Sequence, residues 1–163
     1  MSKSSIQQAT KVFNIIRDIP YQLNVAQKDT SCSSKAKLLG ELLTRLGFTV
    51  RNMCCIFDWN ELPIPQSLAK LATKKFGKIN YHFFLAVKID NRWLNLDPTW
   101  DKSLCPPLPL STWDGKSDAV IAVPAKSIRV YKKKFKFENR LKSGEFAIIF
   151  NNWLAQTRRQ CER

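Results

Sequence analysis

The sequence predicts an α+β domain in which a central helix packs on an antiparallel β-sheet. Three features indicate this fold class: a helix with a wide apolar face that begins at about Cys32, a strand over 49–57, and two apolar runs joined by Asp90 and Asn91. The chain has 163 residues, of which 44% are hydrophobic, so it can bury one core and is short for two ordinary domains. We therefore expect a single domain over residues 1–163.

The first two helices are predicted from the spacing of apolar residues. In the first, apolar side chains recur every three or four positions, at Ile6, Ala9, Val12, Phe13 and Ile16. This helix should end before Pro20, because the residue before a proline disfavours helical geometry. A polar loop follows, and Thr30 and Ser31 are suitable N-cap residues for a second helix that begins at Cys32 and stops at Gly47. Its apolar stripe consists of Ala36, Leu39, Leu43 and Leu46.

The segment 80–99 predicts a β-hairpin whose tight turn is Asp90 and Asn91. A two-residue loop places Ile89 opposite Arg92 and puts one set of apolar side chains on a common face: Phe83, Leu85, Val87, Ile89, Leu94 and Leu96. The other face then carries both His82 and Asp97, which become diagonal neighbours on adjacent strands. We expect the helix that begins at Cys32 to abut this face. A three-residue loop would put these two residues on opposite faces.

The remaining elements are predicted from shorter patterns. A short helix is expected over 67–76, further strands over 119–123 and 128–137, and a helix or strand over 146–154. The proline-rich sequence CPPLPLSTWDG that begins at Cys105 reads as an extended surface segment. Residues 102–163 therefore add a proline-rich stretch, extra strands and a C-terminal element to a core at about 10–101.

Composition points to a soluble, cytoplasmic protein without a cofactor. No apolar stretch reaches the roughly 20 residues of a membrane-spanning helix, and the N-terminus lacks the apolar core of a signal peptide. Five cysteines without regular spacing suggest reduced thiols rather than a disulfide framework. The chain has no CxxC pair and a single histidine, so we expect no metal site.

The net charge of +14 raises the question of a polyanionic partner such as nucleic acid. The densest basic run, 126–142, has eight Lys and Arg residues and one Glu. It fits either a nucleic-acid strip or an edge strand whose lysines prevent pairing with another sheet, and we favour the edge strand. Because no nucleic-acid-binding motif accompanies the charge, we do not expect nucleic acid to be the main partner.

Three residues together suggest thiol catalysis. Cys32, in the first turn of a helix, is placed where backbone amides and the helix dipole favour a thiolate. His82 can act as its base, and Asp97 can fix the tautomer of the histidine by accepting its other ring N–H. Each residue taken alone is commonly structural: a buried thiol, a packed histidine, or an aspartate in a turn.

The sequences TSCSSKAKLLGELLTRLGFTVR and YHFFLAVKIDNRWLNLDPTWD resemble the core of the transglutaminase-like superfamily of papain-related thiol enzymes. The preceding VFNIIRDIPYQL is similar to the helix and loop before the nucleophile in many prokaryotic members. This resemblance covers roughly residues 10–101 and implies a papain-like fold with Cys32, His82 and Asp97 as the catalytic triad. Thr30 stands where many members have glycine, and no tryptophan precedes Cys32 at the position that assists the oxyanion in transglutaminases.

The resemblance implies acyl transfer through a thioester on Cys32, and hydrolysis of a peptide or protein amide is the reaction we favour. Transfer to an amine, as in transglutaminases, a catalytically silent protein-binding module and a basic nucleic-acid-binding protein are the alternatives. The Cys32 amide can supply one oxyanion donor, and Gln22 or Tyr21 could supply another. Trp93 and Trp100 could line an acyl pocket or belong to the core.

Overall fold

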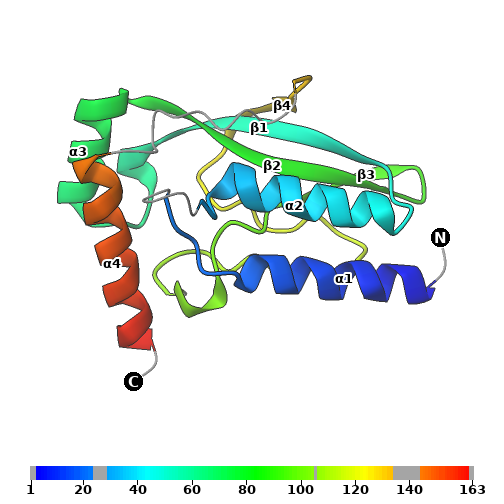
Figure 1. Cartoon of the computed structure of the whole chain (residues 1–163). Helices are drawn as coiled ribbons and strands as arrows, with labels where there is room; N and C mark the ends of the chain where they lie inside the picture. Colours follow the sequence, from blue (N-terminus) through cyan, green and yellow to red (C-terminus); the bar gives the residue numbers. More distant parts are fainter. Residues whose placement is uncertain (1–2, 24–28, 105, 134–143, 162–163) are drawn as a thin grey trace.

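A computed structural model describes residues 3–23, 29–104, 106–133 and 144–161 of the chain. Within these residues the fold is α+β, with one antiparallel sheet and four α-helices (Figure 1). The elements are α1 (Lys3–Asp18), α2 (Cys32–Arg45), β1 (Val50–Asp58), the 3₁₀ turn η1 (Trp59–Glu61), α3 (Gln66–Phe76), β2 (Ile79–Ile89), β3 (Arg92–Leu96), the 3₁₀ turn η2 (Lys102–Leu104), β4 (Lys126–Val130) and α4 (Glu145–Cys161). No helix in the described ranges combines the length and apolar character needed to cross a bilayer.

The four strands lie in the order β3-β2-β1-β4, and every neighbouring pair is antiparallel. The predicted hairpin is confirmed: Ile89 pairs with Arg92, and the two turn residues Asp90 and Asn91 have φ angles of 45° and 64°. Two successive positive φ values are typical of the type I′ turn, whose twist matches that of the flanking strands. The even loop therefore fixes which side chains share a face.

Both faces of the sheet are covered by apolar side chains. On one face α1 and α2 lie side by side (Figure 1) and form a core with hairpin residues that include Leu85, Val87 and Leu96. The opposite face, which includes Phe84 and Ala86, packs in a second core with α3 and α4. Because side chains alternate along a strand, this second face is also the one that His82 shares.

The position of α2 corrects one detail of the expected arrangement. We expected this helix to abut the His82 face, but its body packs on the opposite face, where Gly40 approaches Leu85. β3 ends at Leu96 opposite Leu85, so its pairing with β2 stops before His82. Only the N-terminal end of α2, which carries Cys32, meets His82 beyond the end of that pairing.

The ends of α2 lie close to where they were predicted. Ser31 occupies the N-cap position, but its side chain forms no capping bond. The carboxylate of Asp29 accepts instead from the Ser31 amide at 3.1 Å and from the Ser34 hydroxyl at 2.7 Å. At the other end Gly47 has a φ of 84°, a conformation that glycine adopts without the strain a Cβ would cause.

The C-terminal third differs more from the prediction. Residues 119–123 form no regular strand, although the Ala119 amide donates to the Asn95 carbonyl at 2.8 Å. The proline-rich segment is partly internal, because Leu108 and Trp113 are buried. The edge strand predicted over 128–137 is present in part as β4, Lys126–Val130; residues 131–133 are not in a strand, and 134–137 lie outside the described residues. The last element, predicted as helix or strand, is the helix α4.

Candidate active site

The hairpin brings His82 and Asp97 into direct contact. The distance between His82 Nε2 and Asp97 Oδ2 is 2.6 Å, within the range of a short charge-assisted hydrogen bond. Asp97 has no exposed surface, and His82 exposes only 3% of its surface. The predicted proximity of His82 and Asp97 is therefore confirmed. Nε2 is the ring nitrogen that faces the carboxylate.

Both carboxylate oxygens of Asp97 have further donors. Oδ1 accepts from the Thr99 hydroxyl at 2.5 Å and from the Thr99 amide at 3.2 Å, and Oδ2 accepts from the Ala122 amide at 2.8 Å. Burial alone would raise the pKa of Asp97. The charge of His82 and the hydrogen bonds from His82, Thr99 and Ala122 instead lower this pKa below its usual value. Asp97 is thus a fully buried but ionised group with a fixed orientation.

His82 forms the link between Asp97 and Cys32. Burial lowers the pKa of His82, but the charges of Asp97 and Cys32 and its hydrogen bonds to both side chains raise it to about 10. Because Nε2 faces Asp97, Nδ1 is the ring nitrogen left for the Cys32 thiol. The three side chains form a chain of contacts in which a protonated imidazole lies between a carboxylate and a sulfur atom.

Cys32 is the first residue of α2 and is partly exposed, unlike its two partners. The first hydrogen bond of the helix runs from the Lys35 amide to the Ser31 carbonyl at 3.0 Å. The amides of Cys32, Ser33 and Ser34 therefore precede the helical ladder and point out of the helix end. These donors and the helix dipole favour negative charge at the Cys32 sulfur.

A second thiol beside His82 was missed from the sequence. Cys55 pairs with His82 across β1 and β2, whereas the sequence assigned the single histidine as partner to Cys32 alone. Cys55 is 1% exposed, and burial, together with the charges of Asp97, Cys32 and Cys54, raises its pKa to about 12. It is thus a protonated, inaccessible thiol, and Cys32 is the candidate nucleophile.

Lys35 is a further buried group near Cys32 that was not predicted from the sequence. Its amine, one helical turn after Cys32, is 2% exposed and donates to the carbonyls of Arg17 at 2.7 Å and Thr99 at 2.9 Å. Burial lowers its pKa to about 7, despite the opposing charges of Asp101, Asp97 and Asp18. Its position in the apolar stripe of α2, three residues after Cys32 and four before Leu39, was the available signal.

The two tryptophans proposed as an acyl pocket have different environments. Trp100 is 3% exposed, donates its indole N–H to the Ala122 carbonyl at 2.8 Å and packs against Tyr21 at a centroid distance of 4.6 Å with the rings tilted by 58°, so it belongs to the core. Trp93 is half-buried, and the Arg51 guanidinium lies 4.2 Å from the centre of its ring. The core alternative therefore holds for Trp100.

Tyr21 and Gln22, the two candidates for a second oxyanion donor, lie on the segment before Cys32. Thr30 binds this segment, with its amide donating to the Gln22 carbonyl at 3.2 Å and its hydroxyl to the Pro20 carbonyl at 2.7 Å. Burial, and then the charges of Cys32, Asp29 and Asp97, raise the pKa of Tyr21 well above its usual value. Tyr21 is thus close to both Cys32 and the hairpin.

The described part of the chain contains no cluster of three or more His, Cys, Asp or Glu side chains that could hold a metal ion. Comparisons with protein-family models, with curated proteins and with solved structures found no match to this chain.

Proposed function

We propose that the protein is a cysteine-dependent acyl-transfer enzyme that hydrolyses a peptide or protein amide, with Cys32 as nucleophile, His82 as general acid and base, and Asp97 as the group that orients His82. One observation carries this proposal. A buried His82–Asp97 pair, joined at 2.6 Å, contacts a partly exposed cysteine at the start of a helix. Nucleophilic cysteine enzymes use this combination of groups because the thiolate, rather than the thiol, attacks the substrate.

In the acylation step the Cys32 thiolate attacks the carbonyl carbon of the amide and forms a C–S bond. The negative charge that develops on the carbonyl oxygen is stabilised by the Cys32 amide, at the helix N-terminus. His82 donates the proton on Nδ1 to the departing nitrogen as the C–N bond breaks. The products are a free amine and a thioester on Cys32.

In the second step the neutral His82 takes a proton from the acyl acceptor, which attacks the thioester as the C–S bond breaks. Water as acceptor gives a carboxylic acid, and an amine gives a new amide; either returns the Cys32 thiolate and protonated His82. Asp97 stays ionised throughout and holds the imidazole with Nδ1 towards the sulfur. The resemblance to the transglutaminase-like superfamily supports these same roles and leaves the acceptor open.

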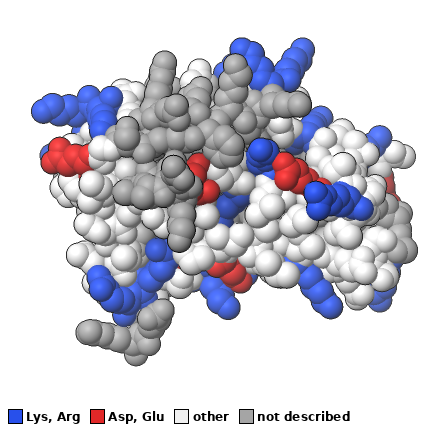
Figure 2. All heavy atoms as spheres, in the orientation of Figure 1, with Lys and Arg blue, Asp and Glu red and all other residues white. Residues whose placement is uncertain are grey.

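The electrostatics of the surface give little support for nucleic acid as the main partner. Figure 2 shows Lys and Arg side chains at several separate places on the visible face, with acidic side chains between some of them. Lys126 at the start of β4 forms an ion pair with Glu61, which reduces the free charge of that edge. Diffuse charge of this kind supports weak, salt-sensitive binding rather than a specific site.

The test is whether Cys32 becomes acylated. The protein is mixed with p-nitrophenyl acetate, and intact and peptide mass spectrometry locate the acetyl group while nitrophenolate release is followed over time. We expect acetylation of Cys32 that is lost in Cys32→Ala and retained in Cys161→Ser, because Cys161 lies on the exposed end of α4. Addition of an amine such as glycine ethyl ester then distinguishes hydrolysis from amine transfer. A thiol that is not acetylated would favour the silent module instead.

A further inference from the structure

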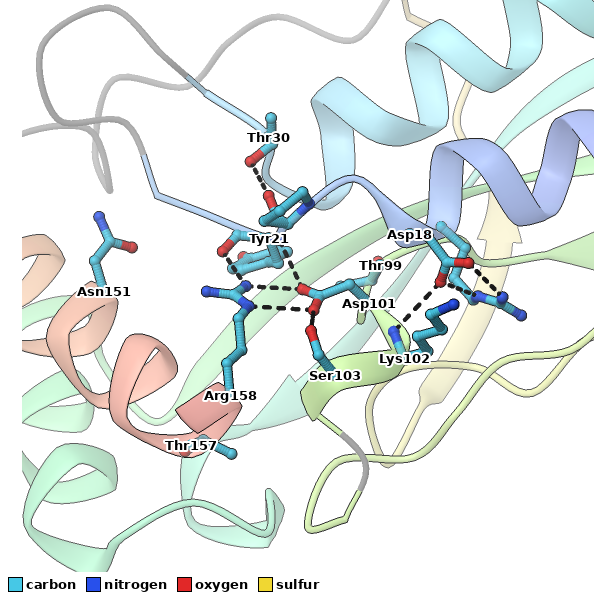
Figure 3. A network of polar contacts seen from close by, with 12 residues as sticks. Asp18, Tyr21, Thr30, Thr99, Asp101, Lys102, Ser103, Asn151, Thr157 and Arg158 are labelled. Carbon is cyan, nitrogen blue, oxygen red and sulfur yellow. Dashed lines mark hydrogen bonds and ion pairs between the residues drawn. The ribbon is translucent and has the colours of Figure 1, made fainter. Parts of the chain in front are cut away.

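The segment Tyr21–Leu23 lies beside the nucleophile and is held by the C-terminal helix. The Tyr21 carbonyl accepts from Arg158 Nη2 at 2.8 Å. Asn151 binds Leu23 twice, accepting from its amide at 3.0 Å and donating to its carbonyl at 2.8 Å. Figure 3 shows Arg158 and Asn151 reaching from α4 towards this segment. Two side chains of one helix therefore fix both ends of the segment.

Asp101 joins the same helix to the loop that follows Asp97. Its carboxylate accepts from Arg158 Nε at 3.2 Å and Nη2 at 2.7 Å, from the Ser103 hydroxyl at 2.5 Å, and from the Tyr21 amide at 2.8 Å. Asp101 is 1% exposed, so this ion pair is well shielded from solvent. As Figure 3 shows, α4, the loop after Asp97 and Tyr21 converge on one carboxylate.

These contacts leave one residue of the segment with free donors. The polar backbone groups of Tyr21 and Leu23 are all bonded, and the Gln22 carbonyl accepts from Thr30. Among the described residues, neither the Gln22 amide nor its half-buried side chain has a hydrogen-bond partner. Gln22 is therefore a donor on a rigid support, in the segment that Thr30 ties to the start of α2.

We propose that Arg158 and Asn151 of α4 are positioning residues for acylation of Cys32, which hold Tyr21–Leu23 so that Gln22 supplies the second donor to the developing oxyanion. This inference rests on the proposed function and gives the C-terminal helix a role that the transglutaminase-like resemblance, confined to roughly residues 10–101, does not assign. An oxyanion donor must be held rigidly, since a donor that reorganises during the reaction stabilises the charge less. Arg158 and Asn151 supply that rigidity without touching the substrate.

The experiment compares two reactions of the same thiol. Acetylation by p-nitrophenyl acetate passes through a tetrahedral oxyanion, whereas alkylation by iodoacetamide displaces iodide at carbon and forms none. For Arg158→Gln and Asn151→Leu we expect the acetylation rate constant to fall about 10- to 100-fold, somewhat less than the loss of a whole oxyanion donor. The alkylation rate constant should stay within about twofold of the unmodified protein, because His82 and the helix end are unchanged.

The chain offers matched controls on the same helix. Arg159→Gln and Asn152→Leu make the same chemical changes at neighbouring exposed positions, and they should leave both rates unchanged. Asn151→Asp keeps the acceptor for the Leu23 amide and loses the donor to its carbonyl, so its acetylation rate should lie between those of the unmodified protein and Asn151→Leu. It also serves as the gentler variant if Arg158→Gln does not fold.

The possible outcomes are distinct. Equal losses of acetylation and alkylation in the α4 variants would assign these residues a purely structural role and overturn the inference. Unchanged acetylation in Arg158→Gln, or an equal loss in Arg159→Gln, would overturn it as well while leaving the proposed function intact. If Cys32 of the unmodified protein is alkylated but never acetylated, the proposed function fails and this inference fails with it.

Discussion

The two sides of the candidate site are built by different means. On one side His82 and Asp97 are 15 residues apart and are joined by a single hairpin. On the other side Tyr21–Leu23 is held by Asp101, Asn151 and Arg158, which are 80 to 137 residues away in the chain. The first arrangement is a consequence of local register, and the second exists only once the C-terminal helix has docked. We call these the hairpin side and the α4 side.

If the proposed function is correct, this difference separates two contributions to catalysis. The hairpin side supplies the buried carboxylate that raises the pKa of His82, the proposed base for Cys32. The α4 side would hold the proposed hydrogen-bond donor to the substrate oxygen in place. Substitutions on the hairpin side should therefore change all reactions of Cys32, whereas those on the α4 side should change only reactions that form an oxyanion.

The largest effect is expected from Asp97→Asn on the hairpin side. An asparagine whose oxygen accepts from Thr99 places its N–H₂ at the Oδ2 position, where it faces the Ala122 amide, which is also a donor, and His82 Nε2. This arrangement favours the His82 tautomer with no proton on Nε2. We expect the turnover number for acyl transfer to fall about 1,000- to 10,000-fold, as such changes do in related triads. The measurement is steady-state release of nitrophenolate. Asp114→Asn, at an exposed turn, is the matched control and should retain full activity; a loss below about tenfold in Asp97→Asn would contradict the orienting role.

A smaller effect on the same side is expected in alkylation. At pH 6 an ordinary thiol with a pKa of about 8.5 is almost fully protonated and reacts slowly with iodoacetamide. We expect Cys32 to react first and His82→Ala to slow it about 10- to 100-fold, because the imidazolium that stabilises the thiolate is gone. The measurement is the alkylation rate of each cysteine by peptide mass mapping.

The exposed Cys161 is an internal reference for that experiment. If Cys32 reacts no faster than Cys161, or if its rate is indifferent to His82, the ion pair does not form and the silent-module alternative gains support. Asp97→Asn should slow Cys32 less than His82→Ala does, because it misorients the imidazole rather than removing it. Arg158→Gln should not slow it at all, which is the sharpest contrast between the two sides.

The hairpin side was largely predictable from the sequence, for a physical reason. A two-residue turn at Asp90 and Asn91 fixes the register, and the register alone decides that His82 and Asp97 share a face. The start of α2 was similarly predictable, because Thr30 and Ser31 are suitable N-cap residues and apolar residues at helical spacing follow them. The packing face of α2 was not, because an apolar stripe specifies that a helix is buried but not which face of the sheet buries it.

The α4 side could not be predicted, because its contacts join segments that no local pattern relates. Asp101 reads as an ordinary polar residue after a strand, and Arg158 as a basic residue in the last turn of a helix. The buried carboxylate shared by Arg158 and Tyr21 appears only when the segments are packed together. The same limit explains the strand wrongly predicted over 119–123: Ala119, Ala122 and Val123 are buried, but the segment forms no regular ladder, and its Ala122 amide binds Asp97 instead.

On the α4 side Arg158→Gln should also lower stability. The substitution breaks the paired hydrogen bonds to Asp101 and the bond to the Tyr21 carbonyl, and it leaves a buried carboxylate without its cation. We expect the free energy of unfolding to fall by about 1.5–3 kcal/mol, the range for hydrogen bonds to charged groups. The measurement is urea unfolding at pH 7, with Arg159→Gln expected within about 0.5 kcal/mol of the unmodified protein. Equal effects of the two substitutions would mean that the network adds nothing measurable to stability.

Lys35 lies between the two sides, because it binds the Thr99 carbonyl after Asp97 and the Arg17 carbonyl before Tyr21. Lys35 and His82 make stability depend on pH in opposite directions. Burial lowers the pKa of Lys35 to about 7, so between about pH 7 and 10.4 the unfolded chain binds more protons at this position and stability rises with pH. Although burial opposes it, the charges of Asp97 and Cys32 raise the pKa of His82 to about 10, so the folded state binds more protons. That stabilisation is complete below about pH 6.5 and is lost as the pH rises through about 10.

Both residues are tested together by the slope of stability against pH, where the expected effect per half-unit step is small. In the unmodified protein the two contributions oppose each other between about pH 7 and 10. In this window the slope of the unfolding free energy against pH should be more positive in His82→Gln than in the unmodified protein, because only the Lys35 contribution remains. In Lys35→Met the slope should be more negative, and each change should be at most about 1.4 kcal/mol per pH unit. The measurement is the free energy of urea unfolding at half-unit steps from pH 6.5 to 10.

The control is Lys37→Met, an exposed change on the same helix, which should keep the slope of the unmodified protein. It separates the loss of a buried amine from the loss of a surface charge. Slopes that are parallel in all four proteins would show that neither His82 nor Lys35 is shifted by its surroundings, and the electrostatic part of the hairpin side would have to be abandoned.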